Sequence, residues 1–160
     1  MTSDLSAAET VSVRSFRAAQ LVRAGVLIAV GVAIAFTAPL HRDLNFDTTV
    51  MSAGLALIGA ATLLEYFAIR GSSESWWVAA RAIVAIAAAG SMFVVTDTAT
   101  LALLVALWAA LTAFITLMRL SRGVQSFKIA LPSLLLSVAL AVTAFLSRQD
   151  PVALIGFFGA

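Results

Sequence analysis

The sequence predicts an all-α fold: a polytopic transmembrane helical bundle of three antiparallel hairpins, with the sixth helix incomplete in this chain. Hydrophobic residues make up 62% of the 160 residues and charged residues 11%, whereas about a quarter of the residues in a soluble domain are charged. The apolar stretches are long enough to cross a bilayer, because roughly 20 apolar residues span its hydrocarbon core as a helix. They are continuous and rich in Ala and Leu, unlike the alternating pattern of a transmembrane β-strand.

Two parts follow one another along the chain. Residues 1–20 form a polar or interfacial N-terminal segment, in which 1–13 is expected to be disordered or to lie on the membrane surface. Arg14 and Arg17 beside apolar residues predict a short interfacial helix over 11–20. Residues 21–160 form a single transmembrane domain, with spans at about 21–38, 47–69, 76–95, 98–118 and 129–147 and a partial span at 151–160.

Two features leave alternatives open at the ends of the chain. A signal peptide competes with the first span, because Arg14, Arg17 and Arg23 precede an apolar stretch in which Ala33-Ile34-Ala35 resembles a cleavage site. The sixth helix has about ten residues after Asp150, which is about 15 Å and too short to cross. Either this sequence stops before the natural terminus, which the abrupt apolar ending favours, or the helix ends inside the bundle.

The basic residues indicate orientation and exclude a nucleic-acid partner. Eight of them fall on the side of the N-terminus: Arg14, Arg17, Arg23, Arg70, Arg81, Arg119, Arg122 and Lys128. Only Arg42 and Arg148 fall on the other side, so the N-terminus is expected in the cytoplasm. A net charge of +2 carried at helix ends does not favour nucleic acid, and the absence of Cys excludes a disulfide framework and a Cys-based metal site.

One charge lies inside each of two neighbouring apolar spans, Glu65 five residues before Arg70 and Arg81 five residues after Trp76. In an antiparallel hairpin both then lie about 7–8 Å inside the same membrane face. Because an ionisable group inside a membrane normally finds a partner, we expect a Glu65–Arg81 ion pair that fixes the hairpin. In the alternatives, Glu65 is a proton relay or substrate site, or Glu65 faces a partner subunit while Arg81 reaches the lipid headgroups.

Three further features mark helix starts and interfaces. Asp47, Asp97 and Asp150 each stand at the start of an even-numbered span, where an aspartate side chain accepts hydrogen bonds from free amides of the first turn. The recurrence of an aspartate at these three helix starts favours an internal repeat. Trp76 and Trp77 fit an aromatic belt at the inner interface. His41 is expected to be a solvated residue of the first outer loop.

Small residues recur at helical spacing and mark faces on which helices approach closely. The candidate packing residues are Gly25, Ala29, Ala33, Gly54, Ala61, Ala85, Ala88, Ala102, Ala106, Ser133 and Ser137. One chain can satisfy some of these faces internally, and the rest are available to another copy or another membrane protein. In so Ala-rich a sequence such stripes also arise by chance.

Some of these residues carry a resemblance to a known family. Arg23-Ala24-Gly25 opens the first span, Pro39 closes it, and Gly54 and Gly59 lie in the second. Asp150-Pro151, followed by Gly156 and Gly159, starts the last hairpin in the same style. In this pattern the chain, over about 23–160, resembles the HdeD-like small integral membrane proteins of bacteria, although its middle hairpin has no proline between its spans. The resemblance implies three helical hairpins, a bacterial inner membrane and a link to acid resistance, and it carries over no catalytic residue.

The sequence therefore predicts a non-catalytic inner-membrane protein that acts through helix packing. It is expected to be an accessory or structural subunit, or a homo-oligomer, with lipids and a membrane protein as partners and with no cofactor or metal. No histidine pair, acidic cluster, phosphate loop or nucleophile–base set supports an enzyme. The alternative is a small transporter or channel using Glu65 and Arg81.

Overall fold

The computed structural model describes residues 2–37, 40–41, 43–123 and 126–159, and of 2–14, 129, 151–153 and 157 only the backbone. These residues form helices and connecting turns, with no strand among them. The helices are α1 (Thr2–Phe36), α2 (Leu44–Ala68), α3 (Ser75–Ser91), the 3-10 helix η2 (Met92–Val94), α4 (Thr98–Ser121), α5 (Phe127–Leu146) and α6 (Pro151–Gly159). The predicted end of the first span at Pro39, and Arg42, lie outside the described residues.

In the described part of the chain, four helical segments are long and apolar enough to cross a membrane: Ser15–Phe36, Leu44–Ala68, Ser75–Val94 and Thr98–Ser121. A fifth apolar helix, Ala130–Leu146, is shorter. Together with the helical bundle into which they pack, these segments identify a multi-pass membrane protein, and the all-α fold class predicted from the sequence is confirmed.

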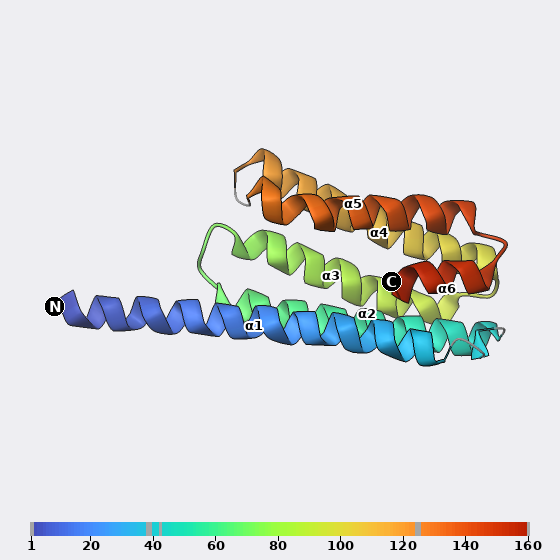
Figure 1. Ribbon diagram of the computed structural model, residues 1–160, viewed down its shortest axis with the longest axis horizontal. Coiled ribbons are helices and arrows are strands. Elements are labelled where there is room, and N and C mark those ends of the chain that lie inside the picture. The colour runs from blue at the N-terminus through green and yellow to red at the C-terminus, as the bar shows by residue number, and fades with distance from the viewer. Residues whose placement is uncertain (1, 38–39, 42, 124–125, 160) are drawn as a thin grey trace.

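The helices run back and forth between two ends of one bundle. At one end, here called the basic end, α2 and α4 finish and α3 and α5 begin; at the opposite end α1, η2 and α5 finish (Figure 1). Helix α2 packs most extensively on α3 and on α1, while α4 packs on α5. Figure 1 places α1 and α2 along one edge and α4 and α5 along the other, with α3 and α6 between them.

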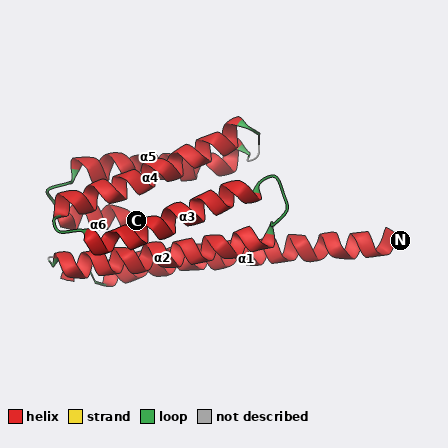
Figure 2. Ribbon diagram, turned by 180° about the vertical axis from the view of Figure 1, so that it is seen from behind, coloured by secondary structure: helices red, strands yellow, loops and turns green. Residues whose placement is uncertain are grey.

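Helix α1 differs from the sequence expectation. It is one continuous helix of 35 residues, about 52 Å long, and its N-terminal part extends beyond the basic end with no other helix beside it (Figures 1 and 2). Disorder over residues 1–13 and a separate short helix over 11–20 are therefore wrong for the described backbone, while a location of this segment on the membrane surface stays a prediction. The physical reason is that the sequence between Thr2 and Ala24 has no proline or glycine to end a helix.

The contact between α2 and α3 depends on a glycine. A Cβ atom at Gly59 would lie 2.7 Å from the Ile86 side chain and 3.4 Å from the Ile86 backbone nitrogen. Only a residue without a side chain lets the two backbones come this close, as small residues generally do at helix contacts in lipid. Further along the same bundle the core is fully buried at Met51, Leu55 and Val105.

The described part of helix α6 packs inside the bundle. It contacts α1, α5 and α4, and its Leu154 and Ile155 are fully buried. Its last turn touches α1 so closely that a Cβ at Gly31 would lie 2.6 Å from the carbonyl oxygen of Gly159. Helix α6 therefore fills the space between α1 and the α4–α5 pair.

Candidate functional site

Glu65 of α2 makes its ion pair with α1 and not with α3. Its Oε2 accepts a hydrogen bond from Nη1 of Arg23 at 3.1 Å, and Glu65 is only 3% exposed. No ion pair joins Glu65 to Arg81 in the described part of the chain, so the predicted pair is wrong in its partner. Arg81 is half-buried and still interacts electrostatically with Glu65. The rotation of α2 directs the Glu65 carboxylate toward α1, and the predicted depth of Glu65 in the membrane stays a prediction.

A second ion pair lies next to the first. Nη2 of Arg119, near the end of α4, donates to Oε2 of Glu74 at 3.4 Å. Arg119 is 7% exposed, whereas Glu74, in the turn before α3, is partly open to solvent. Arg81 interacts electrostatically with both Arg23 and Arg119, so these groups form one arrangement. We call it the arginine cluster, composed of Arg23, Glu65, Glu74, Arg81 and Arg119.

The arginine cluster carries more positive than negative charge. Three guanidinium groups face two carboxylates, and the buried Nε atoms of Arg23 and Arg119 have no hydrogen-bond partner among the described residues. An unpaired guanidinium inside a membrane is costly, by about 2.5–3.5 kcal/mol on insertion scales. The sequence predicts a buried ionic partner for neither Arg23 nor Arg119. Arg23 lies near the start of one apolar run and Arg119 at the end of another, at about the level of Glu65 along the bundle. This position was the feature of the sequence that could have indicated their role.

His41 and Asp47 form a buried pair at the opposite end. Nδ1 of His41 lies 2.8 Å from Oδ1 of Asp47, and the two residues are 3% and 1% exposed. The prediction of a solvated His41 is therefore wrong. Because α2 begins at Leu44, Asp47 lies inside its first turn and is not the capping residue. Asp43 caps α2 instead, accepting from the Asn45 amide at 2.9 Å.

The contacts of His41 define where one proton resides. Its Nε2 lies 3.1 Å from the carbonyl oxygen of Ile34 and 3.2 Å from Oγ1 of Thr37. A carbonyl oxygen only accepts, so Nε2 carries a hydrogen. A second proton then lies between Nδ1 and the Asp47 carboxyl, as an imidazolium–carboxylate pair or as its neutral equivalent. In both forms the pair has no net charge, as a buried site requires.

The other predicted caps have different outcomes. Asp97 caps α4: its Oδ1 accepts from the Thr100 amide at 2.8 Å, and its Oδ2 accepts from the Thr100 hydroxyl at 2.7 Å. These hydrogen bonds lower the pKa of the Asp97 carboxyl, led by the bond from the Thr100 side chain. Asp150 immediately precedes α6, and its carbonyl accepts from the Leu154 amide at 3.1 Å. That the Asp150 side chain caps α6 remains a prediction.

The predicted packing residues divide into an internal and an external set. Those on α2 to α5 lie inside the bundle or at its edge: Gly54, Ala61, Ala85 and Ala102 are buried, and Ala88, Ala106, Ser133 and Ser137 are half-buried. Those on α1 face outward, because Gly25, Ala29 and Ala33 are all exposed. A Cβ at Gly25 would meet no atom within 4 Å. We call these three residues the α1 flank.

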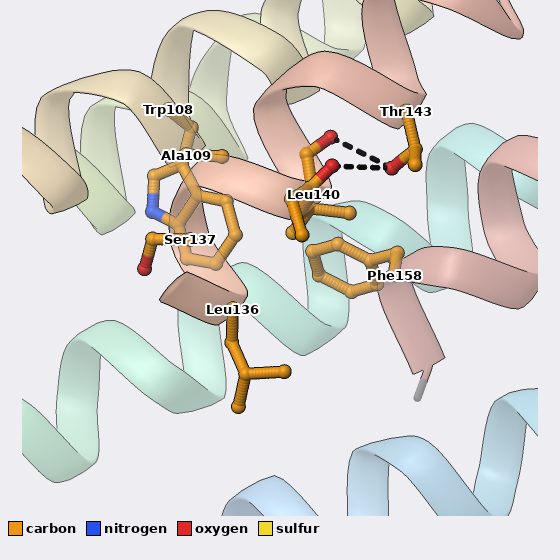
Figure 3. Close-up of a pocket in the computed structure, with 8 residues that line it drawn as sticks. Trp108, Ala109, Leu136, Ser137, Leu140, Thr143 and Phe158 are labelled. Carbon is orange, nitrogen blue, oxygen red and sulfur yellow. Dashed lines mark hydrogen bonds between the residues drawn. The ribbon is translucent and has the colours of Figure 1, made fainter. Parts of the chain in front are cut away.

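Aromatic side chains make contacts at the basic end and inside the bundle. At the basic end Trp76 is 65% exposed. The guanidinium of Arg122 lies 5.1 Å from the ring centroid of Trp77, which is a cation–π contact. In the bundle, Trp108 of α4 packs against Phe158 of α6 with ring centroids 5.6 Å apart. Both Trp108 and Phe158 line a cavity of about 300 Å³ between α4, α5 and α6 (Figure 3).

This cavity is apolar and offers little chemistry. Its lining is formed by Trp108, Ala109, Leu136, Ser137, Ala139, Leu140, Thr143 and Phe158. The Thr143 hydroxyl already donates to the carbonyl oxygens of Ala139 and Leu140 (Figure 3). No group of three or more His, Cys, Asp or Glu that could hold a metal occurs in the described ranges.

No family model, curated protein or solved structure matches this chain. The resemblance to the HdeD-like proteins therefore stays an expectation based on the residues that carry it. The site is described from its own geometry: an arginine cluster at the basic end, a His41–Asp47 pair at the opposite end, and an exposed α1 flank.

Proposed function

We propose that the protein is a non-catalytic packing subunit of the bacterial inner membrane that associates with a second copy of itself through the α1 flank. The observation that carries the proposal is the contrast between the small residues of the two sets. Those on α2 to α5 lie in or beside helix contacts of the same chain, whereas Gly25, Ala29 and Ala33 have exposed surfaces. Small residues four apart on a lipid-facing helix allow another helix to approach closely.

The two ion pairs of α1 support the same function. Arg23 binds Glu65 near the basic end, and His41, just after α1, binds Asp47 at the opposite end. The α1–α2 contact is therefore fixed at two separated points, which sets the rotation of α1. A helix held in one rotation presents a constant outer flank, and this preorganisation lowers the entropic cost of association.

The test compares two Ala→Leu substitutions on the same helix. Ala29→Leu adds bulk to the α1 flank, whereas Ala24→Leu adds the same bulk at an exposed position about 140° away around the helix. We expect the wild-type protein and Ala24→Leu to be oligomeric in mild detergent by light scattering, and Ala29→Leu to be monomeric. A monomeric wild-type protein, or equal effects of the two substitutions, would contradict the proposal.

A transporter or channel is the alternative from another class, and it needs polar groups along a path. Between Glu65 and Asp47 the α1–α2 contact is lined by buried apolar side chains, among them Val30, Met51 and Leu55. This favours a packing role. Glu65→Gln separates the two functions. If the variant is less stable and the wild-type protein shows no solute flux, the packing role is supported. If the variant loses solute flux and keeps its stability, a conduit is supported.

A role in acid or envelope stress belongs to the proposal through the HdeD-like resemblance alone. Its measurement is survival of a host lacking the gene after acid exposure, with complementation by the wild-type chain and by Ala29→Leu. We expect the wild-type chain to restore survival and Ala29→Leu to restore less. Unimpaired survival of the deletion strain would remove the stress role while leaving the packing function standing.

A further inference from the structure

We propose that the arginine cluster binds one phosphate oxyanion at Arg81, supplied by the headgroup of an anionic phospholipid or by a free phosphate ion. This site is separate from the α1 flank and does not depend on self-association. It would be formed by four helices, because Arg23 comes from α1, Glu65 from α2, Arg81 from α3 and Arg119 from α4 (Figure 1).

The hydrogen bonds in the cluster leave Arg81 without a carboxylate of its own. Glu65 is engaged by Arg23 at 3.1 Å and Glu74 by Arg119 at 3.4 Å. Arg81 lies close enough to Arg23, Glu65 and Arg119 to interact with all three, and two of the three are cations. The buried Nε atoms of Arg23 and Arg119 also have no hydrogen-bond partner among the described residues, so the two carboxylates do not fully satisfy these guanidinium groups.

The charge count favours an anion as the missing partner. Three guanidinium groups and two carboxylates leave one positive charge in excess within the arginine cluster. A monoanion beside Arg81 would neutralise this excess and accept hydrogen bonds from its planar fork of N–H groups. A phosphate group suits these N–H groups better than an acceptor with one oxygen does, because arginine can donate two parallel hydrogen bonds to two phosphate oxygens.

The position of the cluster is consistent with a phosphate ligand. It lies at the basic end, beside the turn that contains Glu74 and close to Trp76 and Trp77. Tryptophans are enriched at the depth of lipid headgroups, so the same level of the membrane holds phosphate groups. Arg81 keeps part of its surface accessible, and the proposed binding requires that a headgroup or an ion reaches this part.

The experiment measures ligand-dependent stability and lipid retention. The full chain is placed in nanodiscs of phosphatidylcholine, in the same nanodiscs with phosphatidylglycerol added, and in phosphatidylcholine nanodiscs with inorganic phosphate. We expect a higher thermal midpoint with phosphatidylglycerol and a phosphatidylglycerol molecule retained in native mass spectrometry. A rise with inorganic phosphate alone assigns the site to the free ion, and no rise in either condition overturns the proposal.

Three variants separate a built site from general attraction to a charged membrane. Arg81→Gln is expected to weaken binding by about ten- to a hundredfold, the loss of one hydrogen-bonded charge. Arg122→Gln removes one exposed charge at the same end and is expected to leave binding unchanged. If both variants weaken binding equally, or neither does, the proposal is wrong. Should Arg81→Gln fail to fold, Arg81→Lys keeps the charge, and binding as strong as in the wild type would overturn the bidentate site.

Discussion

Replacing Glu65 by Gln tests whether the Arg23–Glu65 pair holds α1 against α2. The substitution keeps the size of the side chain and removes its charge, which leaves the mostly buried Arg23 guanidinium without a counter-charge. Removing one partner of a buried ion pair costs about 3–5 kcal/mol. Because Arg23 keeps 21% of its side chain exposed and Gln still accepts a hydrogen bond, we expect the lower end, about 3 kcal/mol.

The assay is thermal unfolding in mild detergent, combined with a double-mutant cycle. For a chain of this length about 1 kcal/mol corresponds to about 2–4 °C, so Glu65→Gln is expected to lower the midpoint by about 6–12 °C. A cycle of Glu65→Gln with Arg23→Gln should give a coupling energy of about 2 kcal/mol, within the range seen for contacting residues.

A second cycle, Glu65→Gln with Arg81→Gln, serves as the matched comparison. These side chains interact electrostatically but share no ion pair in the described chain, so their coupling is expected to be smaller. A larger coupling to Arg81 than to Arg23 would refute the assignment of the partner and restore the pairing expected from the sequence.

Four other substitutions test three separate parts of the structure. Asp47→Asn leaves His41 buried without a carboxylate and is expected to cost about 3–5 kcal/mol, measured as a lower unfolding midpoint; an unchanged midpoint would contradict the buried pair. Gly59→Ala places a Cβ 2.7 Å from the α3 side chain opposite and is expected to destabilise by about 1–3 kcal/mol, whereas Gly90→Ala, which enters open space, should stabilise α3 by up to about 1 kcal/mol; equal effects would refute the close α2–α3 contact. The lowered pKa of Asp97 means that its contribution to stability is present above its unfolded pKa, near 3.8, and is lost as the pH falls through the folded value. Asp97→Asn should therefore flatten the acid end of the stability–pH curve, and an unaltered curve would show that this cap does not stabilise the fold.

The spans could be predicted from the sequence because hydropathy and length determine them. The expected ranges 98–118 and 129–147 differ from α4 and α5 by no more than three residues at either end. The cap at Asp97 could be predicted for a similar reason: it precedes the first turn of α4 and bonds within three residues of itself. These are local properties, which a short stretch of sequence contains in full.

The partners of the buried charges could not be predicted, because they depend on how each helix is rotated against its neighbours. The depth of Glu65 was derived from residue counts, but a count along α2 and α3 does not say whether the carboxylate points toward α3 or α1. An error of three residues in the start of α2 had a similar effect at the opposite end. It made Asp47 a cap, while the structure places Asp47 within the first turn, where it contacts His41.

The N-terminal segment shows a further limit of sequence patterns. Low hydropathy and charge before Leu21 predict a polar segment up to residue 20, whereas the apolar segment of the structure already begins at Ser15. They do not predict whether the backbone stays helical, because continuation of a helix from an established span needs no nucleation of its own. Helix α1 therefore extends further than its apolar pattern.

The central claim, self-association through the α1 flank, is tested most directly by disulfide crosslinking in the membrane. The chain contains no cysteine, so a single introduced thiol reports one position only. Under mild oxidation we predict that Ala29→Cys yields a disulfide-linked dimer and that Ala24→Cys, on the same helix but on a different side, stays monomeric. A monomer at position 29, or equal dimer formation at positions 24 and 29, would contradict the account.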